Sequence, residues 1–185
     1  MIIGVTGRVG SGKSRAANLA ARKFLVELID LDPVGHELLE HPQVKKMIIK
    51  KISRSIVNED GTINRAALGE IVFSDSEQLR KLDRIMHIRM NAEVLRRINK
   101  NSTRNFIIVG ALLREIGLLK VCHHVVVIDA RDEAIRKAVG DKKSKILASQ
   151  RGREEYQQDG HTIIKNVFNR AFDEKCLTVF STLLA

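Results

Sequence analysis

The chain has 185 residues, enough for one domain with a sizeable core and an inserted subdomain. Lys and Arg number 32 against 22 Asp and Glu, so the formal net charge of +10 favours ligands that carry several negative charges. One Tyr and no Trp leave few aromatic side chains for stacking on bases, so the composition does not favour nucleic acid as the main partner.

The first predicted element is a strand at residues 1–5, followed closely by residues 7–14, which read G-x-x-x-x-G-K-S. This pattern is the phosphate-binding P-loop, whose backbone N–H groups surround phosphate oxygens at the start of a helix. Residues 13–24 carry apolar side chains at helical spacing, which predicts the helix that the motif requires. The sequence therefore predicts a site for the phosphates of a nucleotide at Gly7, Arg8, Val9, Gly10, Ser11, Gly12, Lys13, Ser14 and Arg15.

Two side chains of the P-loop have expected roles in phosphoryl transfer from ATP. Lys13 is expected to reach the β and γ phosphates and to act in catalysis, and the hydroxyl of Ser14 is expected to bind Mg²⁺. The metal is needed because the transferring group carries charge that the ammonium and Mg²⁺ neutralise.

Four further apolar runs are predicted strands of an open, mainly parallel sheet, each buried on both faces. They lie at residues 25–29, 106–109, 124–128 and 162–164, with helices between them. Two carboxylates, Asp30 and Asp32, follow the first run, and ligands bind at the carboxyl ends of such strands. Asp32 is expected to accept a proton from an attacking hydroxyl. Either residue could instead be a helix N-cap or a turn residue, as Asp32 before Pro33 suggests.

The stretch between the second and third strands is too long for an ordinary crossover, since about seventy residues without strand character fill it. It is predicted to be a helical subdomain. Helices are expected from Pro33 through Leu39, around residues 44–52, and from Ser76 onward, with a turn at residues 58–62.

Two cysteines, Cys122 and Cys176, are too few for a disulfide framework, so free thiols of a reducing compartment are expected. The chain opens on a strand pattern with no signal peptide, and no apolar run approaches the roughly 20 residues that cross a bilayer. The sequence predicts a cytoplasmic protein with no membrane partner and leaves its oligomeric state open.

Several stretches resemble the dephospho-coenzyme A kinase family in residues, order and spacing. The most specific is D-G-T-I-N-R-A-A-L-G-E-I-V-F at residues 60–73, because many kinases have a P-loop but few have this segment in the insertion. The P-loop, the pair Asp30 and Asp32 with residues 35–39, and Ile85-Met86-His87 also match. Weaker likenesses at residues 111–113, 126–130, 148–150 and 163–166 extend the resemblance over nearly the whole chain.

The resemblance implies transfer of the ATP γ-phosphoryl group to the ribose 3′-hydroxyl of dephospho-coenzyme A. Asp32 takes the position of the family's catalytic carboxylate and also touches the acceptor, while Asn166 joins the nucleotide-binding residues. His36, Arg65 and His87 fall on motifs of the helical domain that holds the acceptor. A structural role for His36, a solvated helix charge at Arg65 and a satisfied buried imidazole at His87 are the alternatives.

The implied organisation has three parts. A P-loop core comprises residues 1–32, 104–130 and 160–185, a helical acceptor domain comprises residues 33–103, and residues 131–159 form a short lid with the helix or loop after it. The basic stretch from Arg136-Lys137 through Lys142-Lys143-Ser144-Lys145 matches the family's mobile lid, although such a charge run is also typical of a solvated face.

The chain departs from the family at several positions. Val109 stands where relatives usually have an acidic residue, Arg8 and Arg15 replace Gly and Thr, and Gln150 is followed by Arg151-Gly152. Two alternatives to the family activity therefore stay open. One is a catalytically weakened paralogue that binds nucleotide or coenzyme A, and the other is a different P-loop kinase of a small metabolite.

Overall fold

The computed structural model describes residues 1–139 and 144–185 of the chain. They form two compact units, one made of Met1–Asp30 with Ile98–Ala185 and the other of Leu31–Arg97. Lys142 and Lys143 of the basic stretch lie outside the described residues. The division into core, acceptor domain and lid remains a prediction about the role of each part.

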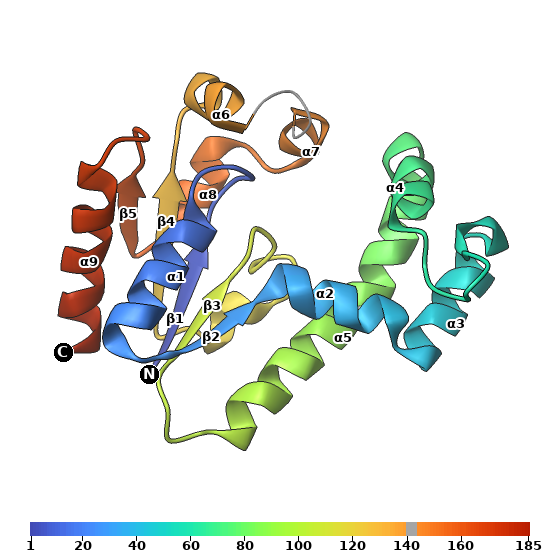
Figure 1. Cartoon of the computed structure of the whole chain (residues 1–185), viewed down its shortest axis with the longest axis horizontal. Helices are drawn as coiled ribbons and strands as arrows, with labels where there is room; N and C mark the ends of the chain where they lie inside the picture. Colours follow the sequence, from blue (N-terminus) through green and yellow to red (C-terminus); the bar gives the residue numbers. More distant parts are fainter. Residues whose placement is uncertain (140–143) are drawn as a thin grey trace. The chain divides into compact units, whose positions relative to one another are not determined.

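The first unit is built on an open sheet of five strands in the order β2-β3-β1-β4-β5, and every ladder is parallel. This confirms the predicted α/β fold class (Figure 1). Because parallel strands end at the same edge, the carboxyl end of β1 is flanked by those of β3 and β4. The strands are β1 (Ile2–Thr6), β2 (Glu27–Asp30), β3 (Phe106–Val109), β4 (His124–Asp129) and β5 (Thr162–Lys165).

Helices cover both faces of the sheet. In Figure 1, α1 (Lys13–Phe24) and α9 (Ala171–Leu184) lie together on one face. In the same view α8 (Arg153–Asp159) lies on the other face, and η2 (Leu118–Val121), α6 (Asp132–Val139) and α7 (Ser144–Ser149) also belong to the unit. The core under α1 and α9 consists of apolar side chains, namely Ile3, Val5, Ala16, Ala17, Ala20, Ile107, Val109, Val126, Ile128, Ile164, Phe172, Cys176 and Phe180.

Two details of the predicted strands are wrong. The second strand begins at Glu27, because Leu25 is the C-cap of α1, with a left-handed φ of 53° and 91% of its surface exposed. The predicted run mixed a helix end with a strand start. Strand β5 is not buried on both faces, because it lies at an edge of the sheet and leaves Ile163 exposed.

The second unit is helical, as predicted for the insertion. Its elements are α2 (Leu31–Glu40), α3 (Pro42–Lys51), η1 (Arg54–Ile56), α4 (Arg65–Ser74) and most of α5 (Ser76–Lys100). The predicted turn at residues 58–62 is present, with the N–H of Asn58 donating to the carbonyl of Thr62 at 2.9 Å. The predicted start of α2 at Pro33 is wrong by two residues, so Asp32 lies in the first turn of the helix.

Both cysteines are free thiols, as predicted. Burial raises the pKa of Cys122 and of Cys176 to about 12, so neither thiol is ionised at neutral pH. In the part of the chain that the structure describes, no helix combines the length and the apolar character needed to span a bilayer.

Candidate active site

Three glycines shape the loop between β1 and α1. Gly7, Gly10 and Gly12 have positive φ angles of 145°, 76° and 98°, a region that other residues enter only with strain. A β-carbon on Gly7 would lie 2.3 Å from the carbonyl oxygen of Ile128, and one on Gly12 would lie 2.5 Å from Nδ2 of Asn166. The loop therefore needs glycine at both positions, and it carries the chain directly from the central strand to the start of α1.

Lys13 and Ser14 begin helix α1 at the end of this loop. Lys13 is only 9% exposed, and its Nζ donates to the carbonyl oxygen of Arg8 at 3.5 Å, which keeps the ammonium over the loop. Ser14 is exposed. The partial positive charge of the helix N-terminus adds to that of Lys13, so this end of α1 favours a phosphate group.

Asn166 supports the loop from the end of β5. Its Nδ2 donates to the carbonyl of Ser11 at 2.8 Å, and its Oδ1 accepts from the N–H of Phe168 at 2.8 Å. The Asn166 side chain is buried, and its hydrogen bond to Ser11 stabilises the conformation of the P-loop. A direct contact of Asn166 with nucleotide stays a prediction.

The two unusual arginines of the P-loop are each paired with a carboxylate. Arg15 forms a fork with Asp173, with both N–O distances at 2.8 Å, and this pairing raises the pKa of the arginine. Arg8 pairs with Asp132 and also donates to the carbonyl of Leu147 at 3.2 Å. Neither guanidinium is therefore an uncommitted charge beside the loop.

The carboxyl end of β4 holds an ion pair that sequence reasoning missed. Arg153 donates two hydrogen bonds to the carboxylate of Asp129, one of them from Nε to Oδ1 at 2.6 Å. These bonds lower the pKa of Asp129 below its ordinary value and keep the carboxylate ionised. The sequence indicated Asp129, because residues 126–130 resemble the family, but only the fold shows its pairing with Arg153.

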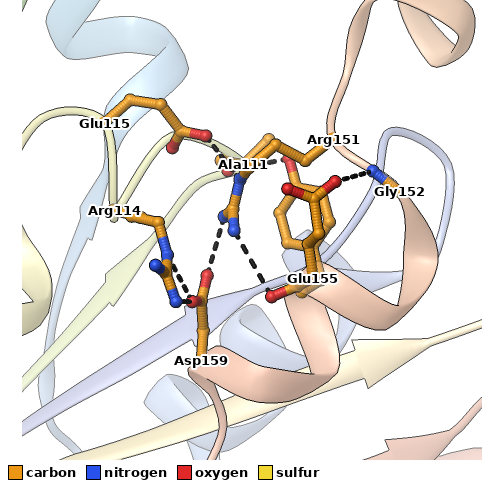
Figure 2. A network of polar contacts seen from close by, with 8 residues as sticks. Ala111, Arg114, Glu115, Arg151, Gly152, Glu155 and Asp159 are labelled. Carbon is orange, nitrogen blue, oxygen red and sulfur yellow. Dashed lines mark hydrogen bonds and ion pairs between the residues drawn. The ribbon is translucent and has the colours of Figure 1, made fainter.

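A second network surrounds Arg151, as Figure 2 shows. Its Nε donates to Glu115 at 2.6 Å, its Nη2 donates to Asp159 at 2.7 Å, and its guanidinium carbon lies 4.3 Å from the ring centre of Tyr156. Burial opposes ionisation of Asp159, but hydrogen bonds from Arg114 and Arg151 outweigh it and lower the pKa of this carboxyl. The network holds the chain in place next to Gln150, whose Oε1 accepts from the N–H of Val9 at 2.8 Å.

Of the two candidate carboxylates, Asp30 ends β2 and is in register with Val109 of the neighbouring strand. Asp32 follows in the first turn of α2, where it is exposed. The helix begins at Leu31, so the residue directly before it is Asp30, and Asp32 is not its N-cap. A carboxylate in a first turn interacts favourably with the positive end of the helix.

The predicted acceptor residues lie on three helices of the second unit. His36 is exposed on α2 next to Gly35, where an added β-carbon would meet Met90 of α5 at 3.6 Å. His87, one turn before Met90, has its Nε2 3.6 Å from a carboxylate oxygen of Asp83. The close approach at Gly35 therefore brings the segments around His36 and His87 near each other.

The third of these residues, Arg65, is the first residue of α4 and is exposed. Helix α4 has a well-formed start, because the side chain of Asn64 accepts from the N–H of Ala67 at 3.0 Å. The turn before it is also ordered by side chains, since Asp60 accepts from the N–H of Thr62 at 2.9 Å. These bonds fix the backbone that carries Arg65 while its guanidinium stays accessible.

The residues around the loop fit Mg²⁺ as an ion held mainly by phosphates. Mg²⁺ keeps several waters in phosphate sites, and the exposed hydroxyl of Ser14 would be its protein ligand at the start of α1. Val109 is apolar and Asp129 is engaged by Arg153, so neither strand end offers a further free carboxylate. Among residues 1–139 and 144–185 there is no cluster of three or more His, Cys, Asp or Glu suited to a metal.

A parallel sheet with a P-loop at the end of its central strand, followed by a helix that starts on Lys13, defines a protein of the P-loop nucleotide-binding class. The model of the dephospho-CoA kinase family matches residues 1–170. The chain belongs to the dephospho-CoA kinase family.

Individual relatives agree with this membership. The dephospho-CoA kinase of Borreliella burgdorferi is 31% identical over 136 residues, which are 74% of this chain and 65% of that protein. The chain thus aligns with slightly less than two thirds of that relative's length.

Solved structures show the same fold over nearly complete chains. A protein of Thermus thermophilus is 25% identical with a TM-score of 0.79, and the match covers 100% of this chain and 98% of the other. The dephospho-CoA kinase of Campylobacter jejuni is 24% identical with a TM-score of 0.73, covering 98% and 96%.

Proposed function

We propose that this chain transfers the γ-phosphoryl group of ATP to the ribose 3′-hydroxyl of dephospho-coenzyme A. The observation that carries the proposal is the P-loop, with Lys13 held over it, in a chain whose residues 1–170 match the dephospho-CoA kinase family. The reaction belongs in the cytoplasm, which agrees with the free thiols of Cys122 and Cys176.

The residues of the loop divide the work on the donor side. Backbone N–H groups between Gly7 and Ser14 surround the phosphates, and Lys13 places a positive charge where negative charge develops on the γ-phosphoryl group. Mg²⁺, when bound, neutralises further phosphate charge, and Ser14 is the residue that would hold it.

On the acceptor side, Asp32 is the residue proposed to orient the 3′-hydroxyl and to accept its proton. Its support is a carboxylate that lies two residues beyond the carboxyl end of β2, in the first turn of α2, and that is exposed to a substrate. His36, Arg65 and His87 are proposed to bind the rest of the acceptor, with Arg65 suited to its phosphate groups because a guanidinium can donate two parallel hydrogen bonds.

Replacing Arg65 with Ala should raise the KM for dephospho-coenzyme A by about tenfold, the loss expected for one charge-assisted hydrogen bond. The KM for ATP should stay nearly constant, because the change removes binding to the acceptor alone. Steady-state kinetics with each substrate varied in turn measures both values. Arg84→Ala, an exposed arginine of α5, is the matched control. Equal changes in both KM values would contradict the assignment of Arg65 to the acceptor.

One observation favours a catalytically weakened relative as the second candidate. Val109 is a buried apolar residue at the end of β3, and Asp129 at the end of β4 is occupied by Arg153, so the usual carboxylate support for Mg²⁺ is reduced. Such a protein would bind ATP or coenzyme A without turnover. A different P-loop kinase would instead turn over with another acceptor.

A coupled assay for ADP release separates these three possibilities. With ATP, Mg²⁺ and dephospho-coenzyme A, the protein should release ADP and form a product phosphorylated at the 3′ position, which mass spectrometry identifies. ATP binding by titration calorimetry without ADP release would favour the weakened relative. ADP release only with nucleoside monophosphates or other small alcohols would favour a different kinase.

A further inference from the structure

The side chain of Arg8 leaves the P-loop and reaches two helices that follow β4. Its guanidinium pairs with Asp132, the first residue of α6, and donates to the carbonyl of Leu147 in α7. These partners lie 124 and 139 positions away in the sequence. The Arg8 side chain thus connects the P-loop to both α6 and α7.

The environment of Arg8 does not suit a cation that binds phosphate directly. Its side chain is 12% exposed and already faces the carboxylate of Asp132, which is 40% exposed. Since the two charges cancel at short range, the pair adds little net attraction for an anion. The guanidinium fork is instead used on a carboxylate and a carbonyl, a geometry that fixes position.

Different elements support the first half of the P-loop, around Arg8 and Val9, and its second half, around Ser11. The first half is held by the Arg8 side chain and by Gln150, which accepts from the N–H of Val9 at 2.8 Å. The second half is held by Asn166, which donates to the carbonyl of Ser11. Gln150 is itself placed by its neighbour Arg151, which is anchored in the network of Figure 2.

We propose that Arg8 is a positioning residue, which acts through Asp132 to keep the first half of the P-loop in the conformation that binds phosphate. This inference rests on the ATP site of the proposed function and assigns to the side chain a task different from that of the loop's backbone. Because well-placed backbone donors decide how tightly a P-loop holds phosphate, losing either partner of the pair weakens ATP binding.

The experiment measures the Kd of ATP with Mg²⁺ by titration calorimetry for Arg8→Ala, Asp132→Asn, the double variant and Glu133→Gln. Positioning predicts that each single change of the pair raises the Kd by about tenfold, the effect of one lost charge-assisted hydrogen bond. The double variant should be no worse than the weaker-binding single variant, because both changes break the same contact. Glu133 is exposed beside Asp132, so Glu133→Gln removes the same charge and should change the Kd by less than about twofold.

A direct electrostatic role predicts the opposite sign for Asp132. Freed from its carboxylate, Arg8 would then attract phosphate more strongly, so Asp132→Asn would lower the Kd of ATP. The single variant Glu133→Gln would also lower it, because it removes a negative charge nearby. A merely structural role predicts lower melting temperatures with an unchanged Kd at a temperature where each variant is folded. Either result would overturn the proposal. Calorimetry does not depend on turnover, so the pattern can be obtained even if dephospho-coenzyme A is not a substrate; if it is, the KM for ATP should rise while that for the acceptor stays constant.

Discussion

Lys13→Ala should remove nearly all turnover, with kcat falling by at least about 10²–10³-fold, the range found when one preorganised donor to a developing negative charge is lost. The structure provides the reason, because the ammonium is 9% exposed and is held over the loop by the carbonyl of Arg8. The two nearby arginines cannot substitute for it, since Arg8 is paired with Asp132 and Arg15 with Asp173. The variant should also lose most of its ATP affinity. ADP release measures the loss of turnover, and titration calorimetry with ATP measures the loss of affinity.

Lys23→Ala is the matched control for this variant. Lys23 is exposed in the last turn of the same helix, so the change removes an equal charge from α1 far from its N-terminus. It should leave turnover and ATP affinity unchanged. If Lys13→Ala bound ATP as tightly as the unaltered protein, the P-loop assignment would be wrong.

Asp32→Asn should lower kcat by about 10²–10⁴-fold, the usual contribution of a general base. Asn keeps the size of the side chain and much of its hydrogen bonding but cannot accept the proton of the acceptor hydroxyl. ATP affinity should survive, because the phosphates are held by the P-loop. Steady-state kinetics and calorimetry on this one variant test both statements, and a thermal melt checks that it remains folded.

A structural account of Asp32 predicts a much smaller effect. Asp32 lies in the first turn of α2, where an ionised carboxylate stabilises a helix by only about 0.3–1 kcal/mol. On that account Asp32→Asn would be a slightly less stable but fully active enzyme, and this result would exclude the proposed mechanism. Asp30→Asn is the internal control, since Asp30 directly precedes α2 and Asn serves as well as Asp at a helix start.

The sequence alone was sufficient for the parts of the site that depend on neighbouring residues. The P-loop could be predicted because left-handed turns at Gly7 and Gly12 and a helix beginning at Lys13 follow from local conformational preferences. The parallel sheet could be predicted from apolar runs of strand length separated by helical patterns. The family was evident from the motif at residues 60–73.

Boundaries failed where two local preferences overlapped. Leu25 belongs to an apolar run that favours a strand, yet it is also the residue that ends α1 in a left-handed conformation. The apolar pattern alone could not show whether Leu25 starts the strand or ends the helix. At α2, the pattern placed the helix start at the proline, but Pro is tolerated throughout a first turn, where its missing N–H has no partner in the helix. The start at Leu31 changes the structural alternative for Asp32 from N-cap to first-turn carboxylate. The roles of His36, Arg65, His87 and Asp32 remain predictions.

What the sequence determined by itself was the P-loop and the helix start at Lys13, since one short segment contains both. Only the tertiary structure decided which side chains support that loop, because the partners meet through strand order. Asn166 lies 155 positions from Ser11, Gln150 lies 141 from Val9, and Asp132 lies 124 from Arg8. No periodicity encodes such pairs, since a charged residue on a helix surface looks the same in sequence whether it faces solvent or a partner. The placement of β4 beside β1 brings these groups together and turns Arg8 from an apparent extra charge into a paired one.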